Sequence, residues 1–256
     1  MTKGKAGELA PHAPALTGRA ALAQRWSRAV FVHWRVDPER VRPLMPEGVE
    51  PDVLDGSAWV ALVPFTLSEF RFLPFAPIPY LGTFHEINVR TYGIDAQGRR
   101  GVVFQTLEAE HALPVLAAHV LFGLPYRWSQ IGMHEDPTAR VREFRSRRRG
   151  VGRRSSARRT STRIRVAIGD QLVDTALSRF LTARWGFHER HVGRTIWTAN
   201  EHPPWPLAQA ELLDLDDDLL AGAGFPDLAA RPPDSVLAMP FDHPGFITRF
   251  GGARRI

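Results

Sequence analysis

The chain has 256 residues, 44% of them apolar, and a formal net charge of +6, which is enough apolar surface for a sizeable core in one large or two small domains. The absence of cysteine excludes disulfide bonds, a thiolate nucleophile and Cys-ligated zinc or iron–sulfur centres. No apolar run approaches the roughly 20 residues that a membrane-spanning helix needs, and we expect a soluble, cytoplasmic protein without membrane contacts.

The first 23 residues are rich in alanine, proline and glycine and lack the continuous apolar segment of a signal peptide. We therefore expect residues 1–23 to form a mobile tail. Residues 24–256 show no internal repeat and are expected to form a single domain.

The first half of the chain predicts strands separated by turns. Asp37 followed by Pro38 is typical of the start of a short helix. Three prolines between residues 72 and 82 predict an irregular loop with exposed aromatic side chains, placed where it could cover a pocket. The strands are predicted at residues 31–36, 58–65, 84–94 and 101–109.

The second half alternates helices with more strands. Pro114 is expected to begin a helix that Gly123 ends, and a second helix is expected to begin at Asp174 or Thr175 and to end at Gly186. Further strands are predicted at residues 128–133, 141–147, 160–168 and 209–215 and on either side of residues 192–194, with a short helix from Asp216 to Ala221. The whole pattern predicts an α+β, mostly β fold, an antiparallel sheet or β-barrel with a few flanking helices.

The strand at residues 84–94 carries an unusual set of polar side chains on one face. Because successive side chains of a strand point to opposite sides, Glu86, Asn88 and Arg90 lie on the same face. In an enclosed pocket, Arg90 could bind a carboxylate and Glu86, its pKa raised by burial, could move a proton. The same spacing fits an ion pair between Glu86 and Arg90 on a solvated sheet face, and the spacing does not decide between the two.

The helix predicted from Pro114 is apolar on all sides except at His119, which indicates a buried helix with one polar group that needs a partner. A buried histidine of this kind is more often a hydrogen-bonded core residue than a catalyst. Tyr126 follows Pro125 just after the helix, so a rigid turn holds it. Its hydroxyl could donate to a developing oxyanion or complete a hydrogen bond in the core.

The histidines do not predict a metal site. His188 and His191 are three residues apart in a predicted strand, which sends them to opposite faces. His33 lies on a predicted strand and His202 precedes a proline-rich turn; either could line a pocket, but a lone histidine is a weak signal. The sequence lacks a glycine-rich phosphate loop and a Gly-x-Ser-x-Gly nucleophile motif, and we expect no cofactor.

Lysine and arginine are distributed very unevenly. Lys3 and Lys5 are the only lysines, so no residue after the N-terminal segment can form a Schiff base with a carbonyl substrate. Twelve of the arginines lie between residues 140 and 165. They could bind a polyanion such as nucleic acid, but Ile164, Val166 and Ile168 alternate with polar residues, which favours a hairpin whose arginines face solvent.

Several motifs, in this order along the chain, resemble those of the YqjF-like proteins, distant relatives of acetoacetate decarboxylase. The resemblance extends from about residue 31 to about residue 225. Its most specific parts are FHEINVRTY and FGLPY. The other motifs are FVHW with DPERVRPLMPEG, DGSAWVALVPF, GVVFQTLEAE, LSRFLTARW and HPPWPL. It implies the acetoacetate decarboxylase-like fold, a mostly antiparallel β-barrel that encloses a pocket.

The resemblance also implies a changed site. In the decarboxylases, the segment that resembles FGLPYR carries two adjacent lysines, the first of which forms the Schiff base. Their positions are occupied here by Tyr126 and Arg127, whereas the glutamate of the same pocket is retained as Glu86. A tyrosine cannot form the cationic imine through which those enzymes decarboxylate. The chain also has His119 where YqjF-like proteins commonly have an arginine.

We therefore expect an enzyme or binding protein for a small molecule that bears a carbonyl or a carboxylate, acting as a lyase, cyclase or isomerase without an imine. The alternative is a polyanion-binding or nucleic-acid-binding protein that uses residues 140–165, which we favour less. A homo-oligomer is compatible with either interpretation. Expected catalytic residues are Glu86, Tyr126 and His119, and expected substrate-binding residues are Arg90, Asn88, Arg127 and His33.

Overall fold

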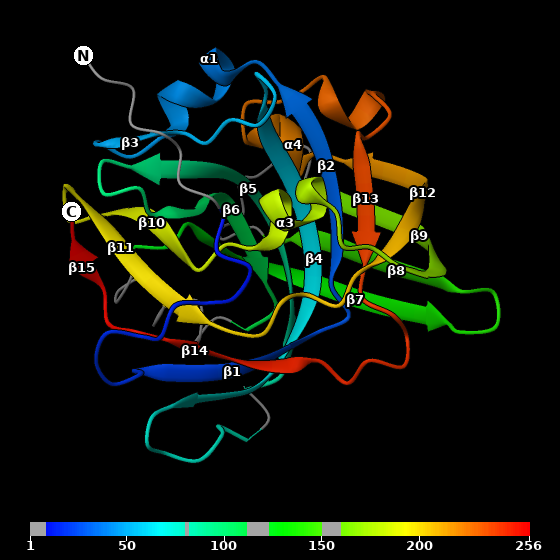
Figure 1. The fold of residues 1–256 in the computed structure, drawn as a ribbon. Helices are drawn as coiled ribbons and strands as arrows, with labels where there is room; N and C mark the ends of the chain where they lie inside the picture. The colour runs from blue at the N-terminus through cyan, green and yellow to red at the C-terminus, as the bar shows by residue number, and fades with distance from the viewer. Residues whose placement is uncertain (1–8, 80–81, 112–122, 150–159) are drawn as a thin grey trace.

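A computed structural model describes residues 9–79, 82–111, 123–149 and 160–256 (Figure 1). The helix predicted from Pro114, with His119, lies outside the described residues, as do residues 150–159 between the strands predicted at 141–147 and 160–168. Among the residues that are described, no helix has both the length and the apolar character needed to cross a membrane.

The described chain is mostly β-structure, as the sequence predicts. The strands are β1 Leu22–Ser27, β2 Val30–Val36, β3 Val49–Pro51, β4 Ala58–Phe72, β5 Phe84–Asp95, β6 Arg100–Ala109, β7 Tyr126–Asp136, β8 Val141–Arg148, β9 Ser161–Leu172, β10 Gly186–His191, β11 Arg194–Glu201, β12 Ala208–Asp217, β13 Ser235–Ala238, β14 Phe246–Phe250 and β15 Arg254–Arg255. The helices are α1 Pro38–Val41, α3 Ala176–Thr182 and α4 Leu219–Gly222, with 3-10 turns at Arg42–Leu44 and Leu228–Ala230.

The strands close into two rings that share β4, β5 and β6. One ring runs β1-β14-β11-β10-β6-β5-β4 and is closed by the pairing of β4 with β1. The other runs β6-β7-β8-β9-β12-β13-β2-β4-β5 and is closed by the pairing of β5 with β6. In Figure 1, β10, β11 and β14 lie to the left of β4, and β8, β9 and β12 lie to its right. Pairings are antiparallel except that β6 is parallel to both β7 and β10.

The shared strand β5 contributes side chains to both ring interiors. Phe84 and Tyr92 belong to the hydrophobic cluster of the first ring, whereas Ile87 and Val89 belong to the cluster of the second. Because side chains alternate along a strand, each face of β5 is buried in a different core. The face that carries Glu86, Asn88 and Arg90 therefore looks into the first ring, and it is buried rather than solvated.

Two boundaries differ from the prediction. Leu22 and Ala23, expected in the mobile tail, are the first residues of β1 and pair with β14, so the expected tail boundary lies too late in the chain. Thr175 caps α3 as predicted, but the helix ends at Thr182 and Gly186 belongs to β10. A Cβ on Gly186 would lie 2.4 Å from the Trp197 ring, so the glycine is needed for close packing and does not end the helix.

Candidate functional site

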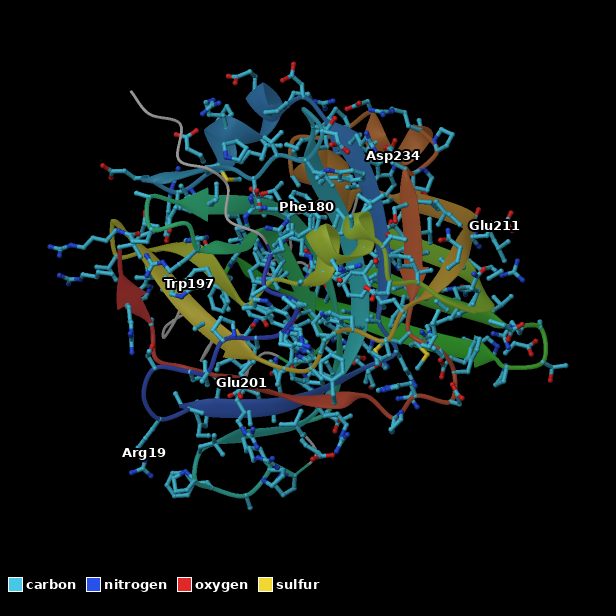
Figure 2. The ribbon with its side chains drawn as sticks, viewed as in Figure 1. Arg19, Phe180, Trp197, Glu201, Glu211 and Asp234 are labelled. Carbon is cyan, nitrogen blue, oxygen red and sulfur yellow. The ribbon has the colours of Figure 1, made fainter. Side chains whose placement is uncertain are left out.

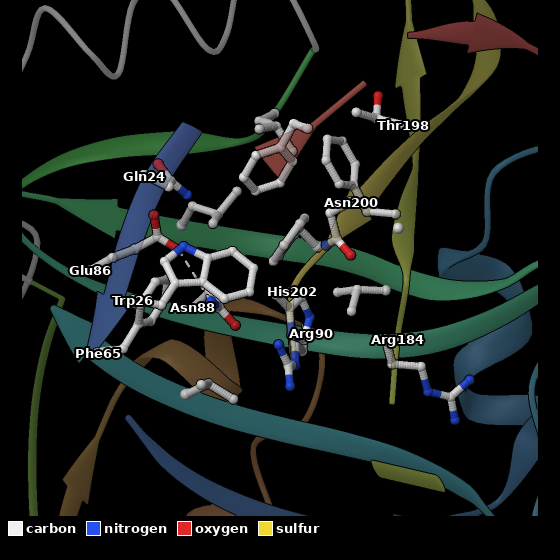
Figure 3. A pocket seen from close by; sticks show the side chains of 18 of the residues that line it. Gln24, Trp26, Phe65, Glu86, Asn88, Arg90, Arg184, Thr198, Asn200 and His202 are labelled. Atoms are coloured by element: carbon white, nitrogen blue, oxygen red, sulfur yellow. Dashed lines mark hydrogen bonds between the residues drawn. The ribbon is translucent and has the colours of Figure 1, made fainter. Parts of the chain in front are cut away.

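The first ring encloses a pocket with a cavity volume of about 110 Å³. Its wall is mostly apolar and strongly aromatic, with polar groups from several strands, which is the usual composition of a small-molecule site (Figure 3). The polar lining residues are Gln24, Glu86, Asn88, Arg90, Tyr126, Thr182, Arg184, Thr198, Asn200 and His202, and the aromatic ones are Trp26, Phe65, Phe70, Phe72, Phe104, Phe187, Trp205 and Phe250.

Glu86, Asn88 and Tyr126 form one hydrogen-bonded group on the pocket wall. Tyr126 is the first residue of β7 and pairs in parallel with β6, which places its ring next to β5. Its hydroxyl donates to Glu86 Oε2 at 2.7 Å, and Asn88 Nδ2 donates to Glu86 Oε1 at 3.2 Å. The fold thus brings Tyr126 into contact with Glu86, which lies 40 positions earlier in the sequence.

Burial sets the protonation of this group. It raises the pKa of Glu86 to about 7, although the hydrogen bonds from Tyr126 and Asn88 and the charge of Arg90 partly oppose the shift. Burial, together with the negative charge of Glu86, raises the pKa of Tyr126 well above its ordinary value. Near neutral pH the Glu86 carboxyl therefore occupies both protonation states, as proton transfer requires, while the Tyr126 hydroxyl keeps its proton.

Arg90 forms no ion pair within the described part of the chain, although its charge acts on Glu86. No described side chain or backbone carbonyl accepts a hydrogen bond from it, and its Nε is buried without a partner. Its guanidinium lies 5.2 Å from the ring centroid of Phe31, which supports it by a cation–π contact. Arg184, by contrast, forms an ion pair with Asp52 and donates from Nε to the Phe180 carbonyl at 2.8 Å. Arg90 is the guanidinium available to a bound anion.

A second polar face comes from β11 and the residues after it, and of its members the sequence interpretation considered only His202. Thr198, Asn200 and His202 alternate along the chain and all line the pocket (Figure 3). His202 Nδ1 donates to the Pro203 carbonyl at 2.7 Å, and burial lowers the pKa of His202 to about 4, so its ring is neutral. The same two-residue spacing that singled out β5 was available here as a signal in the sequence.

Two predicted substrate-binding residues do not reach the pocket. His33 is fully buried behind the wall, with Nε2 2.7 Å from the Tyr92 hydroxyl, and burial holds its pKa well below the ordinary value. Arg127 is exposed, because Tyr126 points into the pocket and the next side chain of the strand must point away. These two assignments are wrong, while His119 lies outside the described residues.

The arginine-rich segment is a strand pair with many internal ion pairs. β8 and β9 are antiparallel, and Ile164, Val166 and Ile168 are buried as the alternation predicts. Of the eight arginines between residues 140 and 165 that the structure describes, five are in ion pairs: Arg140 with Asp170, Arg142 with Glu135, Arg145 with Glu143, Arg148 with Glu108 and Arg163 with Asp214. Pairing reduces the positive field that a polyanion would meet.

Residues 23–241, which make up most of the chain, match the model of the DUF2071 family of uncharacterized conserved proteins. The chain belongs to this family. Among its relatives is the uncharacterized protein YqjF of Bacillus subtilis (strain 168), which is 30% identical over 190 residues, covering 74% of this chain and 76% of that protein. The resemblance to YqjF-like proteins is confirmed.

The DUF2071 chain also has the fold of the acetoacetate decarboxylases. An acetoacetate decarboxylase-like enzyme from Sphingomonas wittichii RW1 matches with a TM-score of 0.61 and 14% identity, over 93% of this chain and 94% of that one. Acetoacetate decarboxylase from Legionella pneumophila matches with a TM-score of 0.62 and 10% identity, over 95% and 91%. The enduracididine biosynthesis enzyme MppR, complexed with the condensation product of pyruvate and imidazole 4-carboxaldehyde, matches with a TM-score of 0.57 and 17% identity, over 97% and 98%. The predicted fold class is confirmed.

Proposed function

We propose that this protein is an enzyme for a small oxo acid, catalysing proton transfer next to the carbonyl in a lyase, cyclase or isomerase reaction without an imine. The observation that carries the proposal is the presence, in one apolar pocket, of an arginine that forms no ion pair with a described residue and of a carboxyl group whose pKa is about 7. The ligands named for the structurally similar MppR, pyruvate and its condensation product, support the same class of substrate.

Each polar group has a role in this proposal. Arg90 binds the carboxylate of the substrate through its guanidinium. The ionised Glu86 takes a proton from the carbon next to the carbonyl, and the electron pair moves onto the carbonyl oxygen as an enolate forms. The Tyr126 hydroxyl turns its proton from Glu86 to that oxygen, and the protonated Glu86 returns a proton to complete the reaction. The sequence holds no lysine after Lys5, which supports a route without a Schiff base.

Ligand binding is tested by thermal shift with pyruvate and longer 2-oxo acids. A ligand that binds only the folded state stabilises it by about 2.7 kcal/mol at a hundredfold excess over Kd, which raises the melting temperature. We expect the Arg90→Gln variant to lose this response and the Arg127→Gln variant to keep it, since Arg127 is exposed outside the pocket. If no oxo acid stabilises the wild type, or if Arg90→Gln responds equally, the proposal is wrong.

Proton transfer is tested by NMR in deuterium oxide. The wild type should exchange the protons at C3 of a bound 2-oxo acid, because Glu86 removes and returns them. Glu86→Gln should slow the exchange by at least about a hundredfold, the usual contribution of a general base. Borohydride added with the oxo acid should trap no covalent adduct, and a trapped adduct would show that an amine of the chain forms an imine after all.

A further inference from the structure

Five residues that line the pocket carry a buried polar atom with no hydrogen-bond partner among the described residues. These atoms are Trp26 Nε1, Asn88 Oδ1, Arg90 Nε, Thr198 Oγ1 and Asn200 Oδ1. Buried polar atoms in folded proteins are nearly always paired, because an unpaired one loses its hydration without compensation. Sixteen buried side-chain atoms lack a hydrogen-bond partner among the described residues, and these five belong to residues that line one cavity, where a bound ligand can supply the partners.

These atoms differ in what they need from a ligand. Trp26 Nε1 and Arg90 Nε can only donate, so the oxygens of a carboxylate or a ketone satisfy them. Asn88 already donates from Nδ2 to Glu86, which leaves its oxygen as an acceptor in need of a donor. The buried oxygen of Asn200 needs a donor as well. A plain oxo acid has no O–H or N–H group once it is ionised and would leave both amide oxygens unpaired.

The two amides approach the cavity from different strands. Figure 3 shows Asn88 on β5 and Asn200 on β11 reaching into the same space, with Arg90 close by. Asn200 is 7% exposed and Thr198 is fully buried. A hydroxyl group both donates and accepts, so hydroxyls placed between these strands match the amide oxygens and the Thr198 hydroxyl together.

We infer that the substrate is a hydroxylated oxo acid, whose carboxylate binds Arg90 and whose hydroxyl groups are recognised by Asn200 and Thr198. The inference rests on the proposed function and specifies its substrate class. It makes Asn200 and Thr198 specificity-determining residues that act by binding rather than by proton transfer. A site built to bind a hydroxyl discriminates strongly against the analogue that lacks it, because its own polar groups are then left unpaired.

The test compares two six-carbon probes, 2-oxo-3-deoxygluconate, which carries three hydroxyls, and 2-oxohexanoate, which carries none. Calorimetric Kd values for the wild type should favour the hydroxylated acid by at least about tenfold. Asn200→Leu has a similar shape and no polar atom, and it should reduce that ratio to below about threefold by weakening only the hydroxylated acid. Because no described group bonds to Asn200 Oδ1, the substitution breaks no described hydrogen bond to that oxygen.

Two threonines provide a matched control. Thr198 and Thr248 are both fully buried with a hydroxyl that has no described partner, but only Thr198 lines the pocket. Thr198→Val should lower the preference for the hydroxylated acid, whereas Thr248→Val should leave it unchanged. This pair also decides the question if Asn200→Leu does not fold.

The outcomes separate the inference from the proposed function. Equal wild-type affinity for the two acids overturns the inference, as does a preference that survives both Asn200→Leu and Thr198→Val. In either case the proposed function stands if Arg90→Gln abolishes binding of both acids. If the wild type binds neither of the two acids, both the inference and the proposed function are wrong.

Discussion

Glu86 shows how burial gives a single residue its chemistry. Its carboxyl group accepts hydrogen bonds from Tyr126 and Asn88 inside an aromatic pocket, and burial outweighs these contacts and raises its pKa to about 7. An ordinary glutamate would be fully ionised at neutral pH and a poor proton donor. The environment, rather than the residue type, makes Glu86 suitable for acid–base work.

The raised pKa predicts a pH-dependent effect of Glu86→Gln on stability. The folded carboxyl keeps its proton to higher pH than the unfolded one, so its contribution to stability is full below about pH 4.5 and is lost as pH rises through about 7. Glu86→Gln cannot ionise and therefore does not lose this stability at high pH. Its unfolding free energy should exceed that of the wild type by about 3 kcal/mol at pH 8 and match it at pH 4, measured by urea denaturation.

Glu189 supplies the control for this experiment. Burial raises its pKa to about 8, but it does not line the pocket. Glu189→Gln should therefore show a similar pH-dependent gain in stability and keep the wild-type response to oxo acids. An equal gain at pH 4 and pH 8 for Glu86→Gln would show that the effect does not come from the buried charge.

At the scale of secondary structure, the pocket depends on the close packing of β10 against β11. Gly186 lies opposite Ala199, and its Cα faces the Trp197 ring and the Thr198 carbonyl. This contact sets the position of the strand that carries Thr198 and Asn200. A glycine within a strand thus marks a place where another group approaches closely.

We expect Gly186→Ala to destabilise the protein. Its Cβ would lie 2.4 Å from Trp197 and 2.6 Å from the Thr198 carbonyl oxygen, and overpacking of this kind costs about 1–3 kcal/mol. Gly132→Ala is the matched control, because Gly132 is also in a strand and no atom lies within 4 Å of its added Cβ. Equal urea midpoints for the two variants would contradict the packing argument.

At the scale of the whole molecule, a buried ion pair connects the segment after β3 with the segment before β10. Asp52 contacts Arg184, which is 132 residues away in the sequence, and also pairs with Arg100 at 3.2 Å. Burial lowers the pKa of Arg184, and Asp52 opposes that shift. Arg184 also lines the pocket, so the ion pair that holds these distant segments together also positions a side chain of the pocket wall.

Asp52→Asn should lower the unfolding free energy by about 3–5 kcal/mol, since it leaves a buried guanidinium without its counter-charge. Asp227→Asn removes the partner of Arg40 at the surface, where exposed ion pairs contribute about 1 kcal/mol or less. Denaturation curves of the two variants should therefore differ clearly. A loss for Asp52→Asn no greater than that for Asp227→Asn would contradict the role of the buried pair.

The sequence alone predicted the strands well because hydrophobic alternation is a local property. It placed Glu86, Asn88 and Arg90 on one face of a strand, which the structure confirms. It misplaced His33 for a reason that is not local: only the packing of β2 against its neighbours decides that its ring meets Tyr92 behind the pocket wall. The assignment of Arg127 to the pocket was wrong because it followed the resemblance to a pair of adjacent lysines. Alternation along a strand sends adjacent side chains to opposite faces, so Tyr126 and Arg127 cannot both face the pocket.

What the sequence determined by itself is the set of chemical groups available: no cysteine, no lysine after Lys5, and a strand with Glu86 and Arg90 on one side. Only the tertiary structure decided that this side is enclosed. Enclosure depends on the pairing of β1 with β4 and of β5 with β6, which closes the rings through hydrogen bonds between distant segments. Alternation fixes which side chains share a face, but long-range strand pairing fixes what that face contacts. For this reason the sequence did not predict that Asn200 of β11 lines the pocket.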